Sequence, residues 1–175
     1  MDRPVHTRLA TRDDAPAIAR IFNQGIQGRM ATFETRLREP EEIRAWLDAD
    51  VPVVVVHAEG RVVAWAAAHP YRPGRAVYRG VGEFSVYVDR SARGRGAGRA
   101  ALRSLIDRCQ ELGYWKLLAR IFPENEVSRR LARSTGFREV GVYRRHGRLD
   151  GEWRDCVIVE RLLGPAGMAD DEREG

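Results

Sequence analysis

Residues 83–99 place the tightest limits on what this chain can fold into. Val86-Tyr87-Val88 is a β-branched and aromatic run, which is typical of a strand. It is followed by the basic, glycine-rich segment Arg93–Arg99 and then by an alanine- and leucine-rich stretch that predicts a helix. Glycine lets the backbone turn sharply and approach a ligand closely, and the free N–H groups at a helix start attract anions. The stretch therefore predicts a polyphosphate held between a strand and a helix.

Three known nucleotide- or nucleic-acid-binding motifs are rich in glycine, and this segment lacks a required feature of each. A Walker A loop ends in Gly-Lys-Ser/Thr, which the segment does not contain. A dinucleotide-binding fingerprint has a G-x-G-x-x-G pattern near a chain start, whereas Gly94, Gly96 and Gly98 are spaced differently and lie mid-chain. An Arg-Gly nucleic-acid tract is longer and flanked by disorder. A plain basic turn is the simplest alternative, but Arg93-x-x-Gly96-x-Gly98 resembles the pyrophosphate-binding motif of the GNAT N-acetyltransferases, which hold acetyl-CoA.

Length and composition indicate one globular domain without a membrane segment. The 175 residues are enough to bury a core, 43% of them are apolar, and no run of about 18 apolar residues occurs. The N-terminus has no signal-peptide core, and Cys109 and Cys156 show no metal or disulfide spacing, so we expect a cytoplasmic protein with reduced thiols. The net charge of +5 comes from arginines interleaved with acids, which suits anionic substrates as well as nucleic acid. We expect no metal, no membrane and no nucleic-acid partner.

Hydrophobic periodicity and turn residues predict an α/β domain over residues 1–163, with elements in the order βααβββαβαββ. Residues 164–175 are acidic and poor in large apolar residues, which predicts a disordered tail. The expected strands are 7–10, 51–57, 61–69, 82–88, 114–122, 138–145 and 153–163. The expected helices follow Thr11, begin at Pro40, run from the glycine turn to Gly113, and run from the cap Asn125 to Leu131.

The predicted order of elements matches the GNAT family over nearly the whole chain. Several short stretches indicate a particular group within the family. Ile21-Phe22-Asn23, 83–88, 123–128 and 151–155 are similar to phosphinothricin N-acetyltransferases, and 31–35 is similar to the related arsinothricin enzymes. The resemblance implies the GNAT fold, a central mixed and mostly antiparallel sheet flanked by helices and splayed at the strand that binds acetyl-CoA. It also implies acetylation of the α-amine of a glutamate-like antibiotic.

The resemblance places acetyl-CoA across the end of the strand at 82–88. It implies that Val86 and Val88 offer backbone groups to the pantetheine arm, while Arg93 and the amides of the glycine turn cradle the pyrophosphate. Asn125 is a helix cap in the simplest interpretation and bonds the pantetheine in the functional one, and both roles can hold together. The expected cofactor residues are Val86, Tyr87, Val88, Arg93, Gly94, Arg95, Gly96, Ala97, Gly98, Arg99, Asn125 and Ser134.

Glu83, at the head of the same strand, is the candidate general base. An acid beside an apolar strand core is costly to keep without a role, and its position resembles that of the base glutamate of the phosphinothricin group. The alternative is a structural ion pair with Arg75 or Arg79. Arginine offers two-pronged hydrogen bonds to the acids of a glutamate-like substrate, and Phe33 would close the pocket on its aliphatic stem. The expected substrate-binding residues are Phe33, Arg75, Tyr78 and Arg79.

The sequence thus predicts an acetyl-CoA-dependent N-acetyltransferase, assembled as a homodimer, that confers resistance to phosphinothricin, arsinothricin or methionine sulfoximine. The alternatives are acetylation of another amine, such as a protein N-terminus, and a non-catalytic acyl-CoA-binding module. Asp150 stands where the phosphinothricin enzymes can carry a histidine, and Ala132 and Arg133 lie where many members carry a tyrosine acid, so the substrate and the acid stay open. Four histidines lack metal spacing and are interpreted as strand or surface residues: His6, His57, His69 and His146.

Overall fold

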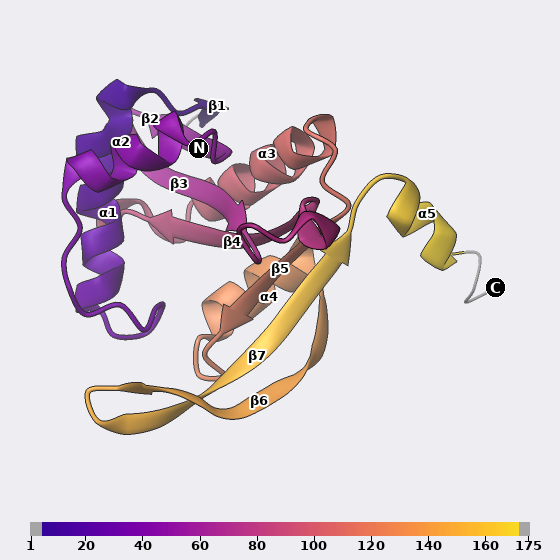
Figure 1. Ribbon diagram of the computed structural model, residues 1–175. Helices are drawn as coiled ribbons and strands as arrows, with labels where there is room; N and C mark the ends of the chain where they lie inside the picture. The colour runs from indigo at the N-terminus through magenta and orange to yellow at the C-terminus, as the bar shows by residue number, and fades with distance from the viewer. Residues whose placement is uncertain (1–4, 172–175) are drawn as a thin grey trace.

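The computed structural model describes residues 5–171, which form one mixed sheet with helices on both faces (Figure 1). The element order confirms the predicted βααβββαβαββ and adds a helix at the C-terminal end. In chain order the elements are β1 (His6–Leu9), η1 (Arg12–Asp14), α1 (Ala15–Gln27), α2 (Pro40–Asp48), β2 (Val53–Ala58), β3 (Arg61–Pro70), η2 (Ala76–Tyr78), β4 (Val81–Val88), η3 (Arg90–Ala92), α3 (Ala97–Glu111), β5 (Lys116–Ile121), α4 (Glu126–Ser134), β6 (Arg138–Leu149), β7 (Glu152–Leu162) and α5 (Pro165–Asp171).

The seven strands lie in the order β1-β2-β3-β4-β5-β7-β6, and every neighbouring pair is antiparallel except β4 with β5. The parallel pair is short, because only Val81–Glu83 is paired with Lys116–Leu118. Beyond Glu83 the two strands separate, while β4 stays paired with β3 as far as Val88. This confirms the expected sheet, mixed, mostly antiparallel and splayed at β4.

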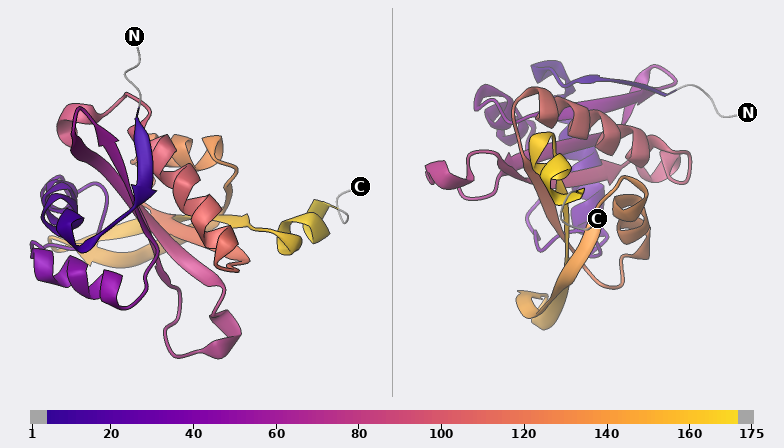
Figure 2. Two further views of the ribbon diagram at one scale, coloured as in Figure 1. Left: turned by 90° about the horizontal axis from the view of Figure 1, so that it is seen from above. Right: turned by 90° about the vertical axis from the view of Figure 1, so that its right-hand side faces the viewer.

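Two hydrophobic cores lie on opposite faces of the sheet. Helices α1 and α2 cover one face, and α3 and α4 lie on the other (Figure 2). Successive strand residues point to opposite faces, so β2 contributes Val54 and Val56 to the α3 side and Val53 and Val55 to the α1 side. All four valines are buried, which explains the unbroken valine run. Within residues 5–171 no helix combines the length and apolar character that a membrane span requires.

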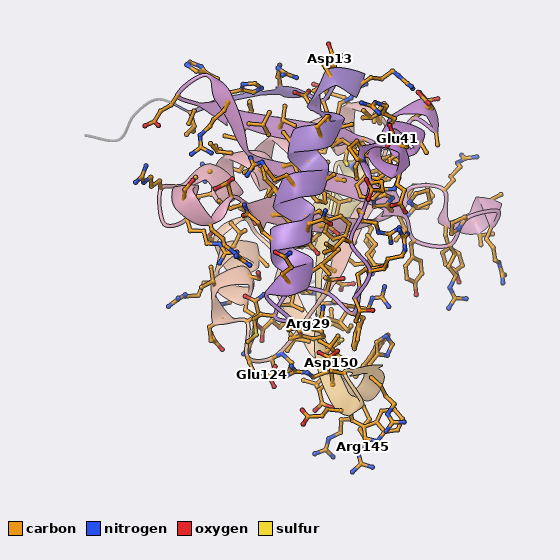
Figure 3. The ribbon with its side chains drawn as sticks, turned by 90° about the vertical axis from the view of Figure 1, so that its left-hand side faces the viewer. Asp13, Arg29, Glu41, Glu124, Arg145 and Asp150 are labelled. Carbon is orange, nitrogen blue, oxygen red and sulfur yellow. The ribbon has the colours of Figure 1, made fainter. Side chains whose placement is uncertain are left out.

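The loop between α1 and α2 is fixed against the long β6–β7 hairpin. The Phe33 ring packs edge-on against Phe122 with 4.9 Å between ring centroids. Gly147 of β6 makes room for it, since a Cβ at this position would lie 2.7 Å from the Phe33 ring. At the tip of the hairpin, Arg29 Nε donates to Asp150 at 2.9 Å, and Figure 3 shows the two residues facing each other. These contacts turn the loop into an ordered wall beside the sheet.

The C-terminal segment differs from the disordered tail expected over residues 164–175. Pro165–Asp171 forms helix α5, while residues 172–175 lie outside the described part of the chain. Gly164 adopts a φ of 55°, which suits the turn after β7, and Pro165 occupies the first helical position, where its missing N–H costs nothing. The acidic composition predicted disorder because it takes no account of Gly164 and Pro165, which start the helix.

Candidate active site

A cavity of about 660 Å³ opens between the sheet and the α1–α2 layer. Strands β3 and β4 contribute His69, Glu83 and Tyr87 to its lining, β5 contributes Arg120, and the α1–α2 loop contributes Phe33. Its volume lies within the range of sites for small ligands. The structure therefore brings three predicted site residues, Glu83, Phe33 and Tyr87, to the same cavity.

One end of the cavity is an aromatic chamber. Tyr87 stacks on Trp65 with ring centroids 4.9 Å apart, and Phe22 lies 4.8 Å from Tyr87. Gly25 in α1 permits this packing, since a Cβ there would lie 2.4 Å from the Tyr87 ring. Burial raises the pKa of the Tyr87 phenol, so the chamber is uncharged at this residue. The indole Nε1 of Trp65 is buried without a hydrogen-bond partner among the described residues, which leaves an N–H donor in the chamber wall.

Glu83 forms an ion pair with Arg120 of β5. Arg120 Nε lies 2.7 Å and Nη2 2.6 Å from Oε1 of Glu83, and Nη1 lies 3.4 Å from His146 Nε2 on β6. The Glu83 side chain is 25% exposed, so it is partly buried, as a residue beside an apolar strand core should be. The alternative partners suggested by the sequence, Arg75 and Arg79, are wrong, because the pairing arginine comes from a different strand.

His69 lies directly opposite Glu83 in the β3–β4 register, so both side chains point to the cavity face. Its ring packs edge-on against Trp46 with 4.7 Å between centroids. Burial lowers the pKa of His69 more than the nearby Glu83 carboxylate raises it, and the imidazole is therefore neutral near pH 7. The sequence analysis treated His69 as an ordinary strand histidine, whereas the structure places it beside the candidate base.

Arg38 is the second guanidinium in the cavity lining and is already paired. Its Nη2 donates to Glu34 at 2.7 Å and its Nη1 to Glu42 at 2.8 Å. Asn23 holds this segment in place, since its side chain accepts from the Arg38 backbone N–H at 2.8 Å and donates to the Arg38 carbonyl at 3.0 Å. The charges of the cavity thus occur in pairs, Arg38 with Glu34 and Arg120 with Glu83.

Cys156 also lines the cavity, but burial raises the pKa of its thiol. It is a neutral thiol near pH 7 and a weak nucleophile. Among residues 5–171 no group of three or more histidine, cysteine or carboxylate side chains is arranged to hold a metal ion. The cavity groups suited to accept a proton are therefore His69 and the carboxylates Glu34 and Glu83, and Glu83 is the one that lies opposite His69.

A second, smaller cavity of about 70 Å³ lies in the split between β4 and β5. Its lining includes Val86 and Tyr87 of β4 and Asn125 of the β5–α4 turn, and it shares Ser85, Tyr87 and Arg120 with the larger cavity. Asn125 caps α4 as predicted, since its Oδ1 accepts from the Ser128 N–H at 3.1 Å. Its Nδ2 donates to the Met30 carbonyl at 3.1 Å and so ties α4 to the α1–α2 loop. The two cavities are therefore adjacent, one at the split and one at Glu83.

The glycine turn lies between β4 and α3. Gly94 and Gly96 adopt φ values of 75° and 81°, in the left-handed region that favours glycine, with open space where a side chain would stand. Gly98 is needed for a different reason, since a Cβ would lie 3.2 Å from Val88 of β4 and 3.4 Å from Leu131 of α4. Ala97 begins a helix of 15 residues, whose first amides have no partner within the helix.

Arg93, Arg95 and Arg99 surround this turn with exposed positive charge, and none of the three forms an ion pair with a residue in the described range. Open amides, a helix N-terminus and unpaired arginines suit a polyphosphate, and the split between β4 and β5 suits the long arm attached to it. The residues present therefore fit the acetyl-CoA that the sequence resemblance implies. Val86 and Asn125 line the smaller cavity, and Gly98 lies beside Val88 at the end of β4.

Four predicted residues line neither cavity and belong neither to β4 nor to the glycine turn. Ser134 is at the exposed C-terminal end of α4, and its hydroxyl donates to the Leu131 carbonyl at 2.9 Å. Arg75, Tyr78 and Arg79 lie on the β3–β4 loop, which protrudes from the sheet in both views of Figure 2. Arg75 lies 5.9 Å from the Tyr78 ring centroid, so these side chains contact each other instead of the cavity. Among the described residues of a single chain, Arg38 and Arg120 are the arginines that line the larger cavity, and the expected fork of Arg75 and Arg79 at the substrate stays a prediction.

Arg120 and His69 are the site residues that sequence reasoning missed. A signal was present for Arg120, because Leu117, Ala119 and Ile121 are buried and the charged residue between them must point to the other face of β5. Nothing local identified that face as the cavity face. For His69 the missing information was the β3–β4 register, which sets it opposite Glu83.

Comparison with known proteins agrees with this geometry. The model of the acetyltransferase (GNAT) family matches residues 22–137. A phosphinothricin N-acetyltransferase of Alcaligenes faecalis is 35% identical over 89% of this chain and 81% of its own length. An L-methionine sulfoximine/L-methionine sulfone acetyltransferase of Pseudomonas paraeruginosa is 31% identical over 89% of this chain and 93% of its own length.

Among solved structures, a GNAT superfamily phosphinothricin acetyltransferase from Sinorhizobium meliloti, in complex with acetyl-CoA, superimposes with a TM-score of 0.85. It is 31% identical and covers 94% of this chain and 90% of its own. The similarity extends beyond the glycine turn to both layers of helices and the whole sheet. This chain therefore belongs to the GNAT family and is an acetyl-CoA-dependent N-acetyltransferase.

Proposed function

We propose that this enzyme acetylates the α-amine of a glutamate- or glutamine-like amino acid, with Glu83 as general base. The observation that carries the proposal is the position of Glu83. It is the last β4 residue paired with β5, so its carboxylate stands where the split begins, on the wall of the larger cavity. Phosphinothricin and methionine sulfoximine, which appear in the names of two relatives, are candidate substrates, and arsinothricin is a third. Acetylation removes the charge of the amine and would confer resistance to such an antibiotic.

The chemistry requires a neutral amine, whereas the amine of a free amino acid is mostly an ammonium near pH 7. Glu83 would accept the proton, directly or through one water. His69, which shares the cavity face and is neutral, would be a second acceptor within the same space. Phe33 would cover the aliphatic part of the substrate, and the aromatic chamber would receive its distal end.

The cofactor would occupy the path from the glycine turn to Glu83. Arg93 and the amides of the turn would hold the pyrophosphate, with Arg95 and Arg99 adding positive charge. Val86, Val88 and Asn125 would contact the pantetheine arm. When bound, acetyl-CoA supplies the acetyl thioester. It stays a prediction that Ser134 binds the cofactor and that Arg75, Tyr78 and Arg79 bind the substrate. The homodimer is a prediction as well.

A thiol-release assay with purified protein and acetyl-CoA tests the proposal. The amine panel contains phosphinothricin, arsinothricin, methionine sulfoximine, a polyamine and a short peptide with a free N-terminus. We expect kcat/KM to be at least about tenfold higher for one of the amino-acid analogues than for the peptide or the polyamine, because the cavity is sized for a small molecule. Faster acetylation of the peptide would contradict the proposal and favour a protein N-terminus as substrate.

A further inference from the structure

Arg120 belongs to none of the sites predicted from the sequence, and its role at the substrate rests on the proposed function. Arg120 is the guanidinium nearest the candidate base, with two nitrogens within 2.7 Å of one Glu83 oxygen. Its side chain is 44% exposed, and that of Glu83 is 25% exposed. An ion pair this accessible contributes little net stability and can exchange partners at little cost.

The two arginines of the cavity differ in how firmly they are held. Arg38 bonds two carboxylates, Glu34 and Glu42, and its side chain is only 22% exposed. Among the described residues, Arg120 bonds one carboxylate and otherwise makes a long 3.4 Å contact with the His146 ring. The buried Nε of Arg38 has no hydrogen-bond partner among the described residues, but both of its terminal nitrogens are bonded. Arg120 is therefore the cavity arginine whose two-pronged fork can be offered to a carboxylate.

An α-amino acid carries an ammonium and a carboxylate on the same carbon, so its two charges complement the Glu83–Arg120 pair. We propose that Arg120 binds the α-carboxylate of the substrate by exchanging it for Glu83, while Glu83 receives the α-ammonium. One ion pair is then replaced by two, and no charge is left without a partner. The exchange makes Arg120 the residue that selects amino acids with a free carboxylate.

The exchange also excludes other amines. An amine without a carboxylate would bring its ammonium to Glu83 and leave the Arg120 guanidinium unpaired beside it, a like-charge arrangement that disfavours binding. For an amino acid the same movement prepares the base, because a carboxylate that has lost its guanidinium partner accepts a proton more readily. Selection and proton transfer would thus depend on the same arginine.

The test compares L-methionine sulfone, its α-carboxamide, and 3-(methylsulfonyl)propylamine, which lacks the carboxylate. Thiol release gives kcat and KM for each amine with the wild-type enzyme and with Arg120→Ala, Arg120→Lys and Arg144→Ala. Arg144 is an exposed arginine of β6 without an ion pair among the described residues, so its variant is the matched control. Because the amine of the amide loses its proton more readily than that of the acid, the diagnostic quantity is the change in the acid-to-amide ratio between enzymes.

We expect Arg120→Ala to lower the acid-to-amide ratio of kcat/KM by about tenfold or more, mainly through a higher KM for the acid, as for the loss of a charged hydrogen bond. Arg120→Lys should give an intermediate ratio, since lysine keeps the charge but not the fork. Arg144→Ala should keep the wild-type ratio. An equal loss for acid and amide in Arg120→Ala would overturn the proposal, because Arg120 would then act only by positioning Glu83.

Failure of the proposed function would give a different result. If the wild-type enzyme acetylates none of the three amines, the substrate class is wrong, and the assignment of Arg120 is then decided by calorimetric titration of the acid and the amide into protein saturated with CoA. The assignment would be supported if the wild type bound the acid at least about tenfold more tightly than the amide, and if Arg120→Ala lost this preference. Equal affinity of the wild type and Arg120→Ala for the acid would refute it.

Discussion

At the residue scale, the reactive end of the cavity depends on which partner each charged group has. Glu83 is held by Arg120 and Glu34 by Arg38, so the two carboxylates lining the same cavity pair with different arginines. His69 is kept neutral by burial, and the Cys156 thiol is kept protonated by burial. Of these groups, Glu83 combines negative charge, partial exposure and a position at the β4–β5 split.

Glu83→Gln should lower kcat by about a hundredfold or more, a usual size for the loss of a general base, while leaving acetyl-CoA affinity nearly unchanged. The amide can still accept from Arg120, so the fold should be retained. Steady-state kinetics and calorimetry with acetyl-CoA check both parts. The matched control is Glu139→Gln, because Glu139 also pairs with an arginine, Arg129 at 2.9 Å, but lies on β6 outside both cavities. Near-normal turnover of Glu83→Gln would show that Glu83 is structural.

At the element scale, β4 organises the site because its two edges differ. One edge is paired with β3 along the whole strand, and the other is paired with β5 only over Val81–Glu83. The strand then leads through η3 into the glycine turn and α3, so the candidate base, the split and the predicted anion site follow one another along one continuous stretch of chain. This order explains why residues 83–99 predicted so much of the site.

Gly96→Glu should abolish measurable binding of acetyl-CoA, since a carboxylate would stand at the predicted pyrophosphate site. The substitution also places a side chain at a φ of 81°, which costs roughly 1–2 kcal/mol in the left-handed region. Gly60→Glu is the matched control, because Gly60 has a φ of 75° and open space around it but lies in the β2–β3 hairpin. Calorimetric titration should show binding only to the control. Undiminished binding to a folded Gly96→Glu variant would remove the turn from the cofactor site.

At the scale of the whole molecule, long-range polar contacts join helix α1 to the sheet. Asp89, at the end of β4, is buried and accepts from the Ser91 N–H at 2.9 Å and from the Ser91 hydroxyl at 2.6 Å. It also pairs with Arg20 of α1 and lies 3.7 Å from Arg61 of β3. Burial alone would raise the pKa of Asp89, but the hydrogen bonds from Ser91 and Arg20 outweigh it and hold the pKa well below its usual range.

Asp89→Asn should therefore lower the free energy of unfolding at pH 7 by about 1.5–3 kcal/mol, the range for hydrogen bonds to a charged group. Because the folded-state pKa is depressed, the carboxylate stabilises the fold above its unfolded pKa of about 3.9, and this contribution is lost as the pH falls toward the folded pKa. The difference between wild type and variant should thus shrink below about pH 4. Urea unfolding at pH 7 and pH 3 measures it.

The control for this measurement is Asp150→Asn, which removes a carboxylate from an exposed pair with Arg29. It should cost less than about 1 kcal/mol at pH 7, as surface ion pairs do. A difference for Asp89→Asn that stayed constant between pH 7 and pH 3 would mean that the charge of Asp89 does not contribute to stability.

The sequence by itself determined the features that depend on neighbours along the chain. Glycines at 94 and 96 mark positive φ values, Asn125 caps the helix that follows it, and the valine run of β2 indicates a strand buried on both faces. These are local effects, since backbone conformation, capping and side-chain alternation act within a few residues. For the same reason the order of elements and the position of Glu83 on the central strand could be predicted.

Only the tertiary structure decided which side chains share the cavity. Arg120 reaches Glu83 across 37 positions of sequence, and His69 meets it through the β3–β4 register. Arg75 and Arg79 are closer to Glu83 along the chain, but the protruding β3–β4 loop carries them away from the cavity. Sequence distance does not measure spatial distance where strands pair and separate, so the partner of the candidate base was set by the splay of the sheet.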